Sequence, residues 1–485
     1  MAEKITPRET DFSQWYLDVV LNARLADYSP VKGCMVIRPN GYSIWEKIRD
    51  SLDRRIRATG TRNAYFPLFI PESFLSREAE HVEGFAPELA VVTQAGGKEL
   101  EERLVVRPTS ETIINSMFSK WIQSYRDLPL KLNQWANVVR WEMRTRLFLR
   151  TTEFLWQEGH TCHATPEEAE QMSREILDVY RNFCEETLAM PVYWGLKTDS
   201  ERFAGAVRTY CIEGMMQDRK ALQAGTTHFL GDNFAKAFET KFLDSDGKEK
   251  LVHQSSWGVS TRLIGGLVMT HSDDKGLVLP PSVAETHVVI IPIGKKGSPE
   301  LESVLIASEK LAEAIRSSNA SVCVQVDADM TKQAGWKFHE VELIGIPLRI
   351  EVGPRDLDKN QAVVARRDTG KKEFLPLEKI PAFVTEALGL MQKNLLDKAK
   401  KFRDENTHRA GSYEEFKKLM ADNAGFVEGA WCQGKECEEK AKTENKSTIR
   451  CLPLDSAWNK IAEKDPCILC GAQKENVRAI MAKSY

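Results

Sequence analysis

The order of helix-like and strand-like segments changes near residue 282, and this change constrains the fold more than any other feature of the chain. Before it, helical and extended segments follow one another without regular alternation, as in the helical 41–60 and the helix opened by Thr165. That mixture favours an antiparallel sheet in an α+β domain. After it, strands and helices alternate, which predicts a parallel or mixed α/β sheet. The alternating segments are the strands 287–293, 322–328, 347–353 and 361–368 and the helices 299–318 and 332–344.

A long helical segment over 381–405 follows and leads into a charged, cysteine-bearing tail. We therefore expect three units: an α+β domain over 1–281, an α/β domain over 282–395 and a small α+β domain over 396–485. Within the first unit, the segment NAYFPLFIP (63–71) predicts an edge or interface strand because Pro67 lacks an N–H group.

Composition excludes several classes of protein. With 42% apolar and 28% charged residues, the chain is typical of globular proteins. Its apolar runs fall far short of the roughly 18 residues of a membrane span, and its polar start, MAEKITPRET, lacks the pattern of a signal peptide. We therefore expect a cytoplasmic protein without a membrane partner. Charge gives no support for a nucleic-acid partner, because 67 Lys and Arg residues face 70 Asp and Glu residues.

Two cysteine pairs in the tail have the spacing of a metal site. Cys432 and Cys437 form a C-x4-C pair, and Cys467 and Cys470 form a C-x2-C pair. Four thiolates from two loops form a tetrahedral zinc site, and because no ligand position stays open, such a zinc ion is structural. Cys451 fits neither pair. The alternatives are free thiols, or iron in place of zinc.

The segment 139–154 combines arginines with a carboxylate and an aromatic ring. On the strand predicted for 137–143, Arg140 and Glu142 share one face. Arg150 and Phe154 follow, and this set suits a nucleotide, since guanidinium groups bind phosphate and a ring stacks on a base. The alternative is a solvated hairpin with paired charges.

Two further segments place polar groups in apolar surroundings. Thr109 and Glu111 are able to bind an amine together, although T-x-E is also an ordinary helix start. Arg262 lies in an apolar, glycine-rich segment and therefore needs an anion, which is either a ligand or a structural glutamate. The sequence has neither a Walker A motif nor a strand–GxGxxG–helix motif, so any ATP site lacks a P-loop.

In this order and spacing, the segments resemble the three motifs of class II aminoacyl-tRNA synthetases. Motif 1 is resembled by residues 60–68, and motif 2 by Arg140-Trp-Glu142 together with Arg150 and Phe154. Motif 3 is resembled by the glycine-rich run with Arg262. The stretches PTSET, FLWQEGHTCHAT, ERFAGA and KALQAGTTHFLGDNFAKAF resemble prolyl-tRNA synthetases of the archaeal and eukaryotic-like type. This resemblance covers essentially the whole chain, including an anticodon-binding α/β domain and a zinc-binding C-terminal domain.

The resemblance implies that the chain joins L-proline to tRNA(Pro) with ATP and Mg²⁺, and that it forms a homodimer through motif 1. It implies catalytic roles for Arg140 and Arg262. The implied ATP contacts are Arg140, Glu142, Arg150, Thr151, Phe154, Gln223, Thr226 and Arg262. The implied proline contacts are Thr109, Glu111, Arg140, Trp156, Glu158, His160, Phe203 and His228. Glu351 and Arg355 are candidate anticodon contacts, with a solvated strand end as the alternative, and the carboxylate of the terminal Tyr485 is expected to reach toward the active site.

Only about 100 residues separate motifs 2 and 3, which leaves no room for a large editing insertion. We therefore expect some activation of alanine or cysteine and proofreading by a factor acting in trans. Three alternatives stay open: a class II synthetase for threonine, glycine or histidine, a non-catalytic synthetase-like RNA-binding or regulatory protein, and a stand-alone editing hydrolase.

Overall fold

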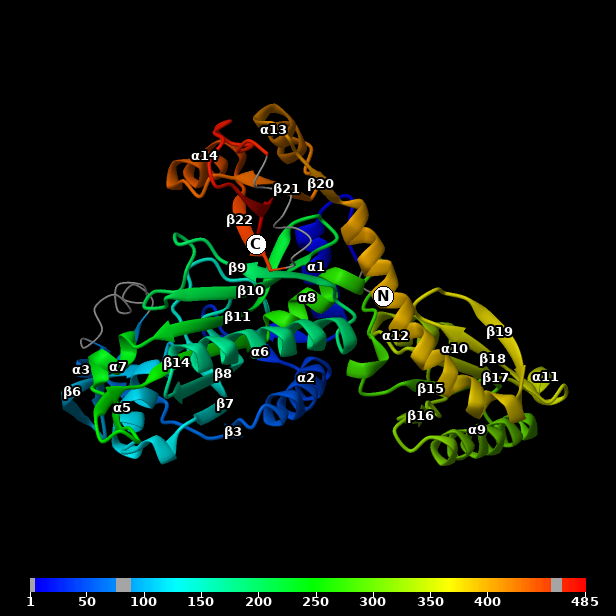
Figure 1. Cartoon of the computed structure of the whole chain (residues 1–485). Coiled ribbons are helices and arrows are strands. Elements are labelled where there is room, and N and C mark those ends of the chain that lie inside the picture. The colour runs from blue at the N-terminus through cyan, green and yellow to red at the C-terminus, as the bar shows by residue number, and fades with distance from the viewer. Residues whose placement is uncertain (1–4, 76–88, 455–464) are drawn as a thin grey trace.

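The computed structural model describes residues 5–75, 89–454 and 465–485. A mainly antiparallel sheet, with parallel pairs only at its two ends, forms the centre of the molecule, and a five-stranded sheet lies apart from it beyond helix α12 (Figure 1). The helices are α1 (Phe12–Asn22), α2 (Pro39–Ala58), α3 (Glu72–Leu75), α5 (Glu111–Trp121), α6 (Pro166–Glu186), α7 (Asn233–Phe238), α8 (Arg262–His271), α9 (Pro299–Ser318), α10 (Ala334–Leu343), α11 (Pro354–Leu357), α12 (Ile380–Glu405), α13 (Tyr413–Ala421) and α14 (Lys435–Asn445).

The central sheet has eleven strands in the order β20-β21-β23-β22-β9-β10-β11-β14-β8-β7-β3. Its strands are β3 (Arg62–Asn63), β7 (Leu130–Val139), β8 (Glu153–His163), β9 (Val192–Leu196), β10 (Arg208–Met215), β11 (Ala221–Gly231), β14 (His253–Ser260), β20 (Thr407–Arg409), β21 (Phe426–Trp431), β22 (Thr448–Pro453) and β23 (Val477–Ala482). The five-stranded sheet has the order β16-β15-β17-β18-β19, with β15 (Val288–Pro292), β16 (Val324–Val326), β17 (Leu348–Val352), β18 (Gln361–Arg366) and β19 (Lys372–Pro376).

Small sheets complete the fold. They are formed by β1 (Ala26–Tyr28) with β2 (Met35–Ile37), by β4 (Phe69–Pro71) with β5 (Ala90–Ala95) and β6 (Lys98–Val106), and by β12 (Lys241–Leu243) with β13 (Glu249–Leu251).

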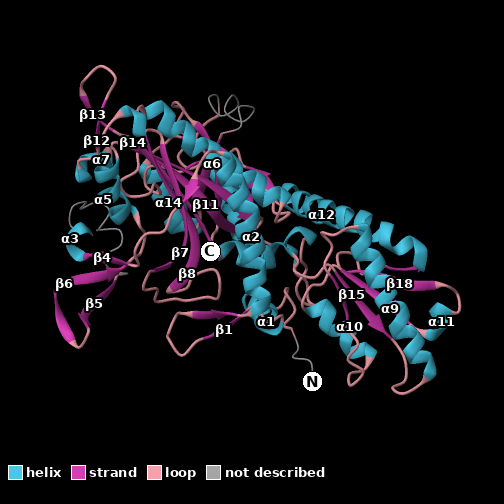
Figure 2. Cartoon of the chain, turned by 90° about the horizontal axis from the view of Figure 1, so that it is seen from below, coloured by secondary structure: helices cyan, strands magenta, loops and turns pink. Residues whose placement is uncertain are grey.

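The main core lies between one face of the central sheet and the helices α1, α2, α6 and α8. Figure 2 shows α6 beside the central strand β11. Ile176 and Tyr180 of α6 lie in this core with Trp257 and Val259 of β14. Thr165 caps α6 with a reciprocal capping box to Glu168, as its sequence predicts. Because strand side chains alternate between faces, burying one face leaves the other free to line a site.

The predicted architecture is confirmed, including the mixed sheet after residue 282: β15 pairs in parallel with β16 and β17, and β18 and β19 run antiparallel. Helix α12 runs through the predicted boundary at 395/396. Strand β22 pairs with β9, so the C-terminal strands extend the sheet of the first unit.

Two predicted strands are shorter than expected. The segment 63–71 forms two short strands in different sheets, β3 and β4, with Pro67 between them. The strand predicted for 137–143 ends at Val139, so Arg140 and Glu142 do not share a strand face. Instead, the Arg140 N–H donates to Thr152 O, and the chain leaves the ladder for a loop over 140–152.

Candidate active site

Four neighbouring strands of the central sheet, β8, β14, β11 and β10, line a cavity of about 290 Å³. The register aligns His160 of β8, Ser256 of β14, His228 of β11 and Thr209 of β10 in one row across the sheet. The adjacent row holds Glu158, Gly258 and Thr226. The further lining residues are Thr109, Glu111, Arg140, Phe154, Trp156, Lys197, Glu201, Phe203, Gln223, Ala224, Gly225, Trp257, Val259, Ser260 and Arg262.

A second cavity of about 220 Å³ adjoins the first, and the two share Arg140, Phe154, Ser260 and Arg262. Its other lining residues are Glu142, Phe148, Leu149, Arg150 and Thr151. The structure therefore joins an acidic, aromatic cavity to an arginine-rich one, with Arg140 and Arg262 in the common wall.

The acidic cavity contains a buried carboxylate pair. Thr109 Oγ1 donates to Glu111 Oε2. Glu158 accepts from Gln134 Nε2 at 2.8 Å and from His160 Nε2 at 3.1 Å. His160 lies behind Glu158 and does not line the cavity.

Burial and neighbouring charges shift the pKa values of Glu111, Glu158 and His160 in different directions. Burial raises the pKa of Glu111. Burial alone would raise the pKa of Glu158 as well, but hydrogen bonding and the charge of His160 outweigh it and lower that pKa. The pKa of His160 is raised, because its two carboxylate neighbours outweigh burial. Burial therefore disfavours the charge of Glu111, whereas Glu158 and His160 stabilise each other's charged forms.

Aromatic rings form the remaining walls of this cavity. Phe203 stacks on the ring of His228 with centroids 4.5 Å apart. The guanidinium of Arg140 lies over Phe154 and Trp156, 5.6 and 5.3 Å from their ring centroids. Trp156 Nε1 and Ser256 Oγ are buried and have no hydrogen-bond partner among the described residues, which leaves both for a ligand.

The second cavity is electropositive. Arg262, the first residue of α8, donates through Nε to Leu149 O at 3.2 Å. Burial, together with Arg150 and Arg140, lowers its pKa to about 10. Within the part of the chain that the structure describes, no carboxylate lies within ion-pair distance of Arg262, and Glu213 acts on it only through its charge. Glu142 Oε2 lies 3.6 Å from Arg150 Nη1. Phe154 also lines this cavity.

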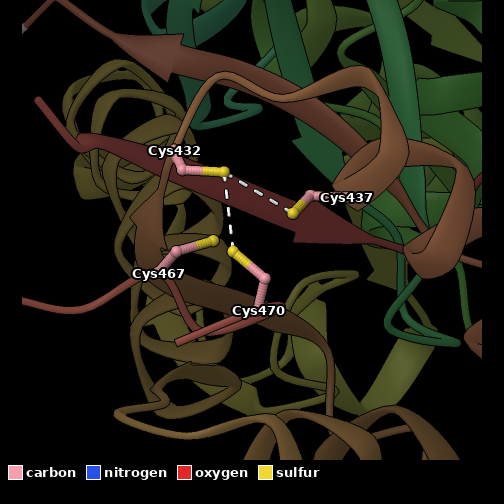
Figure 3. A group of neighbouring side chains, drawn as sticks. All are labelled: Cys432, Cys437, Cys467 and Cys470. Carbon is pink, nitrogen blue, oxygen red and sulfur yellow. Dashed lines mark hydrogen bonds between the residues drawn. The ribbon is translucent and has the colours of Figure 1, made fainter. Parts of the chain in front are cut away.

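The four cysteines of the predicted metal site converge on one point (Figure 3). Cys432 Sγ lies 3.5 Å from Cys437 Sγ and 3.7 Å from Cys470 Sγ, and all four sulfur atoms lie within 4.8 Å of one another. A tetrahedral zinc ion with Zn–S bonds of about 2.3 Å separates sulfur atoms by about 3.8 Å, so this donor set fits zinc. Cys451 is buried in β22, outside the cluster.

The remaining predicted residues lie away from the cavities' lining. Glu351 is buried in β17 and accepts from Arg349 Nη2 and Lys372 Nζ, both at 2.9 Å, whereas Arg355 is exposed on α11. The Tyr485 N–H donates to Ala221 O, and its ring lies near Arg146 and Lys220.

Sequence reasoning missed several lining residues. Ser256, Gly258 and Ser260 alternate with apolar Trp257 and Val259, and that alternation is a signal for a strand with one polar face. Lys197, Glu201 and Thr209 carry no such signal, because only the pairing of β9 with β10 brings them to the cavity.

Three family models match the chain: the tRNA synthetase class II core domain (G, H, P, S and T) over residues 92–271, an anticodon-binding domain over 287–387 and the prolyl-tRNA synthetase C-terminal domain over 413–485. The chain is 58% identical to the proline–tRNA ligase of Chlorobium luteolum and 55% identical to that of Chloroherpeton thalassium, each time over the full length of both chains. It belongs to the prolyl-tRNA synthetase family.

A solved member of this family, prolyl-tRNA synthetase from Cryptosporidium parvum complexed with halofuginone and AMPPNP, matches with a TM-score of 0.93 and 39% identity and covers 99% of both chains. The open alternatives of another synthetase, a regulatory protein or an editing hydrolase are thereby set aside. None of the described helices is both long and apolar enough to span a bilayer.

Because burial lowers the pKa of His228 to about 3, this ring stays neutral in the folded protein while it protonates near pH 6.5 in the unfolded chain. The unfolded state then binds more protons, so stability falls as the pH decreases below 6.5. We expect the pH dependence of the unfolding free energy to be up to about 1.4 kcal/mol per pH unit less steep in H228Q than in the wild type between pH 6.5 and 5. Urea unfolding at several pH values measures this, and parallel curves would contradict it.

Proposed function

We propose that this chain joins L-proline to tRNA(Pro) in two steps. The proline carboxylate attacks the α-phosphorus of ATP, supplied as its magnesium complex, and pyrophosphate leaves. A terminal hydroxyl of tRNA(Pro) then attacks the prolyl carbonyl carbon, and AMP leaves. One observation carries this proposal: an acidic, aromatic cavity adjoins an arginine-rich cavity, and Arg140 and Arg262 belong to both.

The acidic cavity suits the amino acid. The secondary ammonium of proline has two N–H donors, for which Glu111 and Thr109 are acceptors at one end of the cavity. Trp156, Phe203 and His228 supply a largely apolar wall for the pyrrolidine ring. Glu158, held by His160, adds negative charge beside the ammonium.

The arginine-rich cavity suits ATP. Charge that develops on phosphoryl oxygens is stabilised by fixed cations, and no side-chain nucleophile is required. We assign the α-phosphate to Arg140 and the distal phosphates to Arg150 and Arg262. Glu142 accepts from the adenine amino group, and Phe154 stacks on the base. Thr151, Gln223 and Thr226 complete this site.

We assign catalysis to the unit 1–281, anticodon binding to the unit 282–395 and zinc binding to the unit 396–485. We place the protein in the cytoplasm. Glu351 and Arg355 are proposed anticodon contacts. Tyr485, beside Arg146 of the 140–152 loop, directs the terminal carboxylate toward the site. Proofreading of alanine or cysteine is left to a factor acting in trans.

Amino-acid-dependent ATP–pyrophosphate exchange tests the function. We expect strong exchange with proline and weak exchange with alanine or cysteine.

The variant E111Q should raise the KM for proline roughly 10–100-fold, because it loses one charge-assisted hydrogen bond, and it should leave the KM for ATP unchanged. R262A should lower kcat about 100-fold. E101Q, on exposed β6, is the matched control. Exchange with another amino acid, or none from folded protein, would contradict the proposal.

We propose that the four cysteines hold one structural zinc ion, since their sulfur geometry fits it. Elemental analysis should then find one zinc per chain. C470S should lose the metal and melt at a lower temperature, because zinc binding contributes to folding such a unit. C323S, at an exposed cysteine outside the cluster, should keep the metal. Iron in the wild type, or full zinc content in C470S, would refute this assignment.

We also propose a homodimer. Large apolar side chains are exposed on the β1–β2 hairpin and on the 62–71 segment, including Tyr28, Val36, Tyr65 and Phe69, and such patches mark protein contacts. Sedimentation equilibrium should give twice the 55.0 kDa chain mass. The double variant Tyr65→Asp with Phe69→Asp should sediment as a monomer, and F374D on β19 should stay dimeric. A wild-type mass of one chain would contradict the proposal.

A further inference from the structure

The loop over 197–206 forms one wall of the acidic cavity. It begins directly after β9 with Lys197 and carries Phe203, and both side chains line the cavity. Thr209 Oγ1 accepts from the Phe203 N–H at 3.0 Å and lies 3.0 Å from His228 Nδ1. The Lys197 N–H donates to Thr209 O at 2.8 Å. The placement of this loop therefore sets the distance between Phe203 and the opposite wall.

A buried ion triplet fixes the start of this loop. Glu213 of β10 is completely inaccessible and accepts from Lys197 Nζ at 3.1 Å. It also accepts from Arg450 through two nitrogens, from Nη2 to Oε1 at 3.0 Å and from Nε to Oε2 at 3.2 Å. Arg450 comes from β22, in the C-terminal unit. Because a guanidinium fork holds a carboxylate in one orientation, Arg450 orients Glu213 and thereby Lys197.

The C-terminal unit holds the same loop at a second point. Ser200 Oγ donates to Glu438 Oε2 at 2.7 Å. Glu438 follows Cys437 on α14, and Cys437 is one of the four clustered cysteines. The cysteine cluster thus fixes the helix whose next side chain contacts the loop.

The backbone supports both contacts. Leu452 and Pro453 of β22 pair with Leu196 and Gly195 of β9, immediately before Lys197. A Cβ atom at Gly195 would lie 2.1 Å from Leu452 O, so the close approach requires glycine here. The C-terminal unit and the cavity wall are therefore parts of one continuous sheet.

We propose that the C-terminal unit determines the selectivity of the amino-acid cavity, with Arg450 and Glu438 as positioning residues for the 197–206 loop. This inference rests on the proposed assignment of that cavity to proline. One methylene group in a shaped pocket is worth only about 10–200-fold in selectivity, so a small displacement of Phe203 changes the preference for proline over alanine. The arginine-rich cavity does not include this loop, and Glu213 and Arg450 act on it only through their charges on Arg262, so we expect a small effect on ATP binding.

The test compares R450A, R450K and E438A with the matched control E439A, whose exposed side chain is next on α14. Pyrophosphate exchange gives kcat and KM for proline, alanine and ATP, calorimetry gives direct proline binding, and thermal melting reports folding. We expect R450A and E438A to raise the KM for proline about tenfold and to lower the proline-to-alanine ratio of kcat/KM. The KM for ATP should stay within twofold. R450K, which keeps the charge, should recover part of the loss, and E439A should match the wild type.

Glu438 lies at the edge of the unit, so E438A tests the proposal even where R450A fails to fold. An unchanged proline KM and selectivity in folded E438A and R450A would overturn the inference, as would equal losses for proline and ATP. The variant E111Q distinguishes a failure of the cavity assignment from a failure of the inference about the C-terminal unit. If E111Q also leaves the proline KM unchanged, the assignment of the cavity has failed; if it raises that KM while E438A and R450A do not, only the inference fails.

Discussion

The antiparallel pairing of β8, β14, β11 and β10 underlies the rest of this structure. Side chains alternate along each strand, and the register places equivalent positions side by side. Apolar positions such as Trp257 and Val259 belong to the core that the helices cover, although both also border the cavity, and the intervening positions Ser256 and Gly258 line the cavity. A shift of one residue in any of these strands would exchange the two faces, burying polar groups and exposing the core.

The two cavities separate charge in a way that costs stability in the empty protein. Glu111 is buried in one cavity, and Arg262 is buried near two other arginines in the other. Burying a charged group is unfavourable even where hydrogen bonds compensate part of the cost, as Thr109 does for Glu111. Under the proposed function, the ammonium of the amino acid adds a partner for the carboxylates, and the phosphates of the nucleotide add partners for the guanidinium groups.

The C-terminal unit is joined to the centre of the molecule more closely than a separate domain would be. Its strands continue the central sheet, and Arg450 enters a buried ion triplet with Glu213 and Lys197. Breaking a buried ion pair by removing one partner is strongly destabilising. The four cysteines lie in this unit (Figure 3), so the metal proposed there would stabilise a surface that also supports the cavity wall.

The sequence by itself determined the order of the domains, the cap of α6 and the clustering of four cysteines, because these depend on local spacing and on residue chemistry. Most of the predicted cavity residues came from the resemblance to prolyl-tRNA synthetases and not from a local pattern. Thr165 and Glu168 lie three residues apart, and Cys467 and Cys470 likewise. It misplaced Arg140 and Glu142 on a strand, because the end of β7 depends on a hydrogen bond from Arg140 to the distant Thr152. Only the tertiary structure decided that Lys197, Glu213 and Arg450 meet. Those three residues are separated by up to 253 positions, and no local pattern records a pairing between strands that far apart in the chain.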